Sequence, residues 1–177
     1  MYRINELLQS DRKLFHTNDL AILWGISNRQ TLYMTISRYI DSGVLFPVYK
    51  GLYATIPVDS LDPLELGVAI IHRYTYLSTE TVLSQAGLLS QVVYDYTFIS
   101  DQSRRVTVGV WSFRYRQMKA EYLFNPIGIV RERQVFVASI ERAAADLLYY
   151  APDYHFDVTA QVDFELVRSI QKQVGYA

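Results

Sequence analysis

A sharp break between two amphipathic helical patterns constrains the fold of this chain more than any other feature. The apolar residues on each side of the break recur at the i, i+3, i+4 spacing of one buried helix face: Leu20, Leu23 and Trp24 before it, and Leu32, Ile36, Tyr39 and Ile40 after it. Gly25 lies in the break and can adopt the left-handed conformation that ends a helix. Ser27 or Asn28 can then cap the next helix with a side-chain oxygen. The pattern predicts two helices joined by a tight turn.

The second helix turns a distinct set of residues away from its buried face. Helical phase places these residues opposite Leu32 and Ile36: Gln30, Thr31, Met34, Ser37, Arg38 and Asp41. A helix that only faces solvent would more often carry Glu and Lys there. Asn, Gln, Thr and Arg side chains can hydrogen-bond base edges or phosphates in the DNA major groove. The face therefore indicates DNA recognition, although a helix pair used only for protein contacts is a further interpretation.

A hairpin follows the second helix. Ser42 and Gly43 end the helix, and the extended runs 44–49 and 52–56 flank a turn at Lys50 and Gly51. Together with a short first helix at the start of the chain, this order of elements predicts a winged helix-turn-helix. Pro57, Pro63 and the residues between them interrupt both patterns, so we place this DNA-binding domain at residues 1–58.

The predicted DNA-binding residues divide into two groups by their position. The first turn of a recognition helix reaches furthest into the groove, which predicts base contacts for Asn28, Arg29, Gln30 and Thr31, with Ser27 directly before them. Phosphate contacts are predicted for Arg38, further along the helix, and for Lys50 at the hairpin tip. Residues 1–56 carry six Lys and Arg against four acids, a net charge of only +2. Because one such copy attracts phosphate weakly, we expect a homodimer on an inverted repeat in double-stranded DNA.

Residues 59–177 show a different pattern and predict an α+β domain. Helices are expected from residue 63 to about 73, from 79 to 86, from 140 to 150 and from 164 to 174. Strands are expected at 74–78 and at the extended runs 92–99, 106–118, 121–124, 127–131 and 134–138. Turn residues separate several of these runs, which predicts a mostly antiparallel sheet. The fold class expected for the whole chain is therefore α+β.

Composition restricts where the protein acts. The chain has 177 residues, of which 50% are hydrophobic, and it has no cysteine. Disulfides and thiolate metal sites are therefore excluded, which suits a reducing compartment. No signal sequence and no apolar run of the length that spans a bilayer is visible, so we expect a cytoplasmic protein with no membrane association.

A metal-dependent nuclease is the alternative function, with the helix-turn-helix serving to target it. Its site would combine Glu141 and Asp146 with Asp95 or Asp101, but Glu141 and Asp146 are badly spaced for one helix face. We therefore expect Glu141 and Arg142 to cap and charge a helix end, and Asp146 to pair with a neighbouring cation or backbone group. No catalytic residue, metal ligand or cofactor is predicted, and the protein is not expected to be an enzyme.

Three phrases of the sequence resemble the AbiEi family of winged-helix antitoxins. They comprise residues 37–53, with Arg38, Gly43 and the Lys50 to Tyr53 turn; residues 76–88, YLSTETVLSQAGL; and residues 139–148, SIERAAADLL. The resemblance covers most of the chain as spaced phrases in the same order. It implies a sequence-specific transcriptional regulator that is the antitoxin and autorepressor of a type IV toxin–antitoxin operon. The implied partner is a nucleotidyltransferase-like toxin encoded nearby.

Overall fold

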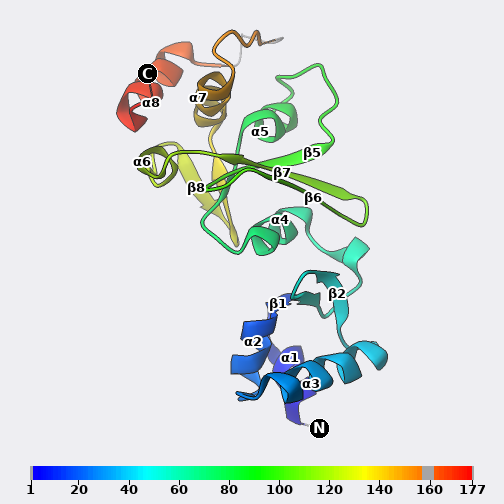
Figure 1. Ribbon diagram of the computed structural model, residues 1–177. Coiled ribbons are helices and arrows are strands. Elements are labelled where there is room, and N and C mark those ends of the chain that lie inside the picture. The colour runs from blue at the N-terminus through cyan, green and yellow to red at the C-terminus, as the bar shows by residue number, and fades with distance from the viewer. Residues whose placement is uncertain (1, 157–161, 177) are drawn as a thin grey trace. The chain divides into compact units, whose positions relative to one another are not determined.

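The computed structural model describes residues 2–156 and 162–176, except for the side chains of residues 2, 3 and 8 (Figure 1). The fold combines α-helices with two β-sheets, as the predicted α+β class requires. The chain divides into two compact units, Met1–Asp62 with Val108–Val110, and Pro63–Thr107 with Trp111–Ala177. The continuous part of the first unit ends four residues beyond the boundary that the sequence predicts at residue 58, and the unit also takes in Val108–Val110, which lie in the domain predicted at 59–177.

The first unit consists of three helices and a small antiparallel sheet. In chain order the elements are α1 (Tyr2–Gln9), β1 (Leu14–His16), α2 (Thr17–Leu23), α3 (Arg29–Asp41), β2 (Phe46–Tyr49) and β3 (Leu52–Ala54), followed by a 3-10 turn at Val58–Ser60. The sheet order is β1-β3-β2. Strand β1, which pairs Phe15 with Tyr53, is absent from our sequence prediction because three residues are too few to show alternation.

The turn between α2 and α3 has the conformation that the sequence predicts. Gly25 has a φ angle of 62°, and the N–H of Ile26 donates to the carbonyl oxygen of Ala21 at 2.9 Å, which closes α2 with a Schellman-type bond. Asn28 is the N-cap of α3, where its side-chain oxygen accepts a hydrogen bond from the N–H of Thr31 at 2.9 Å. Of the two candidate caps, Asn28 therefore performs this role.

The two helices bury their predicted apolar faces against each other. Leu20 is fully buried on α2, and Leu32 and Ile36 are buried on α3. The rings of Trp24 and Tyr39 lie 5.2 Å apart between their centroids, which adds an aromatic contact to this core. The packing fixes which face of α3 is turned outward.

Removing the α3 cap should destabilise the protein measurably. We expect Asn28→Ala to lower the free energy of unfolding by about 1 kcal/mol, because the N–H of Thr31 loses its acceptor. Urea unfolding followed by circular dichroism measures the change. Ser27→Ala is the matched control, since Ser27 is exposed and adjacent. Equal midpoints for the two variants would show that the cap contributes nothing.

The second unit is built on a six-stranded sheet with the order β6-β7-β5-β4-β9-β8. Its helices are α4 (Pro63–Ile71), α5 (Thr79–Gln85), α6 (Ala120–Leu123), α7 (Ile140–Tyr150) and α8 (Phe164–Val174). Its strands are β4 (Tyr76–Leu77), β5 (Asp95–Ser100), β6 (Arg104–Val108), β7 (Trp111–Gln117), β8 (Ile129–Glu132) and β9 (Val135–Ala138). Helix α4 covers one face of the sheet, α5 and α7 lie on the other, and α8 packs beside α7 (Figure 1).

Two features of this sheet correct the sequence prediction. The sheet is mixed rather than mostly antiparallel, because β4 pairs with β9 and β5 pairs with β7 in the parallel direction. Alternation of apolar residues marks a strand but carries no information on the direction of its partner. The run 121–124 is not extended, since α6 occupies most of it. A stretch this short is ambiguous between helix and strand.

Candidate nucleic-acid interface

The outward face of α3 is the first component of the candidate interface. All six residues that helical phase turns away from the core are exposed, together with Arg29 and Tyr33. On the opposite face, Leu32 and Ile36 retain only 4% and 2% of their accessible surface. The predicted phase of this helix is therefore confirmed. The outward face is mainly polar, and Arg29 and Arg38 place two cations on it.

The first turn of α3 brings five of the predicted DNA-binding residues together. Ser27, Asn28, Arg29, Gln30 and Thr31 form one exposed stretch. Within it, the Asn28 side-chain oxygen also accepts a hydrogen bond from the Thr31 hydroxyl at 3.2 Å. These two side chains are thus held in place by the cap. Arg29 and Gln30 project from a helix start whose geometry is fixed.

The turn between β2 and β3 carries the remaining predicted cation. Lys50 is exposed in this turn, beside Gly51, whose φ angle is 69°. The backbone N–H of Thr17 donates to the carbonyl oxygen of Gly51 at 2.9 Å, and the Thr17 hydroxyl donates to the same oxygen at 3.2 Å. Two hydrogen bonds therefore attach the turn to the start of α2. Lys50 lies on a fixed turn, separate in the chain from α3.

Two large hydrophobic side chains of α3 are exposed although they lie outside the predicted DNA-binding set. Tyr33 and Met34 are 50% and 51% exposed, beside the polar residues of the same helix. Helical phase had already turned Met34 outward. The predicted DNA-binding set comprises the first turn of the helix and the cations Arg38 and Lys50, and Met34 belongs to neither group. Its position on the face was therefore readable from the sequence.

The carboxylates of the nuclease alternative occupy separate environments. Asp95 forms ion pairs with Arg105 at 2.7 Å and Arg114 at 3.4 Å, and Asp101 forms an ion pair with Arg73. Asp146 is fully buried in a different place. Within residues 2–156 and 162–176, no group of three or more His, Asp or Glu side chains is arranged to hold a metal ion.

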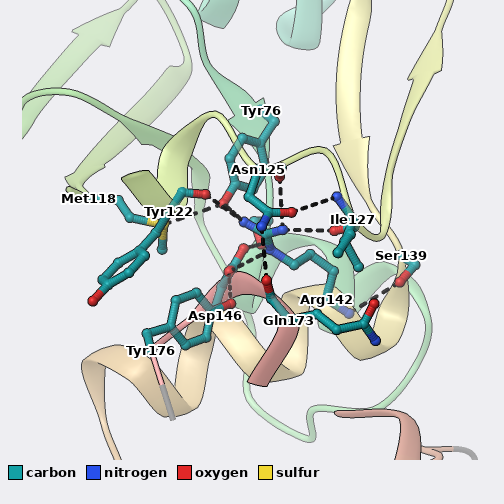
Figure 2. A network of polar contacts seen from close by, with 11 residues as sticks. Tyr76, Met118, Tyr122, Asn125, Ile127, Ser139, Arg142, Asp146, Gln173 and Tyr176 are labelled. Atoms are coloured by element: carbon teal, nitrogen blue, oxygen red, sulfur yellow. Dashed lines mark hydrogen bonds and ion pairs between the residues drawn. The ribbon is translucent and has the colours of Figure 1, made fainter. Parts of the chain in front are cut away.

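Asp146 belongs to a buried polar network around Arg142 (Figure 2). The two side chains are both fully buried, and Nε of Arg142 donates to Oδ1 of Asp146 at 2.9 Å. The Ser78 hydroxyl donates to Oδ2 at 2.7 Å, and the Tyr176 hydroxyl donates to Oδ1 at 2.5 Å. The prediction that Asp146 pairs with a neighbouring cation is confirmed. The prediction that Arg142 charges a helix end is wrong, because its side chain points into the core.

The guanidinium of Arg142 uses all of its N–H groups in this network. Besides Asp146, it donates to the backbone carbonyl oxygens of Tyr122, Asn125 and Ile127 and to the Tyr76 hydroxyl, at distances of 2.7 to 3.2 Å. Figure 2 shows these partners converging on the guanidinium. Burial raises the pKa of the Asp146 carboxyl, and the charge of Arg142 opposes that rise. The network connects β4, α6, α7 and the chain after α8, which indicates a structural role.

Comparison with known proteins adds no assignment. No protein-family model matches the chain, and no curated protein matches it. None of the helices in the described part of the chain is both long enough and apolar enough to cross a membrane.

Proposed function

We propose that the first unit is a winged helix-turn-helix that binds double-stranded DNA, with α3 as the recognition helix and the β2–β3 turn as the wing. The observation that carries the proposal is the outward face of α3, where an exposed polar first turn is held by the Asn28 cap. The attachment of the Lys50 turn to α2 supports it, because a cation held on a fixed turn suits a phosphate contact.

Within this proposal, the residues have separate roles. Arg29 and Gln30 contact base edges, and Asn28 and Thr31, which also form the cap, lie against the groove with Ser27. Arg38 and Lys50 contact phosphates. A long polar side chain near the helix start suits base contacts, because that end of a recognition helix enters the groove.

We further propose that the protein is a transcriptional regulator, specifically the antitoxin and autorepressor of a type IV toxin–antitoxin operon. The support is the resemblance of the three sequence phrases to the AbiEi family. A nucleotidyltransferase-like toxin is the proposed partner. The neighbouring reading frame tests this part directly: a co-transcribed gene with a nucleotidyltransferase pattern agrees with it, and expression of that gene alone should arrest growth.

Specific binding should require two copies of the chain. With a net charge of +2 over residues 1–56, one copy neutralises few phosphates, so a single half-site should bind weakly. Selection from a random duplex library should recover an inverted repeat, with half-sites one or more helical turns apart. Footprinting then compares the full repeat with one half-site. Undiminished affinity for the half-site would contradict the two-copy requirement, and a library with no enriched duplex would contradict sequence-specific DNA binding.

A further inference from the structure

We infer that Met34 determines specificity in the proposed complex by packing against the C5-methyl group of one thymine. This inference rests on the proposed function and adds one base preference to it. Met34 is 51% exposed near the middle of α3, and its side chain ends in an apolar thioether. An apolar side chain of this length in a polar recognition face can bury apolar surface against an apolar group in the groove.

The position of Met34 on α3 favours DNA over a protein partner. Helical phase places Met34 between Gln30, one turn before it, and Arg38, one turn after it. All three side chains are exposed, so they line one strip along the outward face. An amide and a guanidinium lie on either side of the methionine in this strip, and the outward face carries Arg29 and Arg38 against the one carboxylate of Asp41. This balance suits a polyanionic groove better than an apolar protein surface.

The chemistry of the major groove identifies the partner of Met34. Thymine presents a C5-methyl group there, and it is the one apolar group that the four bases offer on that edge. Gln30 and Arg38 can hydrogen-bond bases or phosphates, whereas the thioether can add binding free energy only by burying apolar surface. Met34 therefore favours thymine, or 5-methylcytosine, which carries the same methyl group, at one position of each half-site.

Deoxyuridine substitution tests this inference, since it removes only the methyl group. The probe is the duplex selected with the full chain, with each thymine replaced in turn by deoxyuridine. For the wild-type chain, one replacement in each half-site should weaken binding about four-fold, the factor expected for one buried methyl group. For Met34→Ala, the same replacement should have no effect, because the contact is already lost. Met34→Leu should keep the effect of the replacement.

Leu166→Ala is the matched control, because Leu166 is a comparably exposed apolar residue on α8. It should retain the full response to deoxyuridine. A response that persists in Met34→Ala, or that is absent for every thymine in the wild-type chain, overturns the inference while DNA binding stands. A change in the oligomeric state of DNA-free Met34→Ala also overturns it, because Met34 would then face a second protein chain. Failure of the wild-type chain to enrich any duplex overturns both the proposed function and this inference.

Discussion

Asp146→Ala is expected to lower the free energy of unfolding by about 3 to 5 kcal/mol, the largest stability effect that we predict for this chain. The substitution leaves the guanidinium of Arg142 fully buried without its anion, and it also removes the acceptor of the Ser78 and Tyr176 hydroxyls. Urea unfolding measures the loss. Asp153→Ala, at an exposed aspartate, is the control and should change stability little.

Two further variants separate the charge from the hydrogen bonds of this network. Tyr176→Phe removes one hydrogen bond to a carboxylate and should cost less than Asp146→Ala, about 1.5 to 3 kcal/mol. The double variant Arg142→Met with Asp146→Leu leaves no unpaired charge buried, but it also removes the donor to the carbonyl oxygens of Tyr122, Asn125 and Ile127, so it should recover only part of the loss. An Asp146→Ala protein as stable as Asp153→Ala would contradict the structural role of the network.

The second large effect concerns DNA binding, where substitutions of Arg29 and Lys50 should have different effects on sequence preference and on salt dependence. Arg29→Ala should cost about 1 to 3 kcal/mol on the selected duplex and relax the preference at one base position, because a base contact is lost. Lys50→Ala should weaken binding to all sequences alike, because a phosphate contact is lost. The slope of log affinity against log salt concentration, called the salt slope below, should then fall in magnitude by about one. Affinity measured against salt concentration, on the selected and a shuffled duplex, distinguishes the two.

Lys172→Ala controls for the loss of any surface cation, since Lys172 is exposed on α8 in the second unit. It should leave both the affinity and the salt slope close to those of the wild-type chain. A Lys50 variant that loses sequence preference, or an Arg29 variant that keeps it, would reverse the two proposed roles.

Local signals predicted the helices of the first unit well. The apolar stripes of α2 and α3, the left-handed Gly25 and the Asn28 cap are all encoded within a few residues of where they act. The same holds for α7, where Ser139 accepts a hydrogen bond from the N–H of Arg142, and for α8, whose bounds agree with the prediction. Elements that are stabilised by their own periodicity and caps can be read from one sequence.

Contacts between distant segments could not be predicted in this way. The pairing of β1 with β3, and the parallel direction of the β4–β9 pair, depend on which strands meet after folding. The burial of Arg142 depends on partners up to 66 positions away in the chain, such as Tyr76. Its spacing of four residues from Asp146 was the one local sign of an ion pair. Of the candidate interface, the exposed face of α3 was predictable, whereas the attachment of the Lys50 turn to Thr17 was not.

The affinity of the full chain for a selected duplex, compared with a base-shuffled copy at the same salt concentration, tests the proposed function most directly. Sequence-specific recognition by α3 predicts a preference of about 1,000-fold or more for the selected duplex, because base contacts add to a phosphate attraction that both duplexes share. Equal affinity for the two duplexes would contradict it, since the first unit would then bind DNA only through its charge.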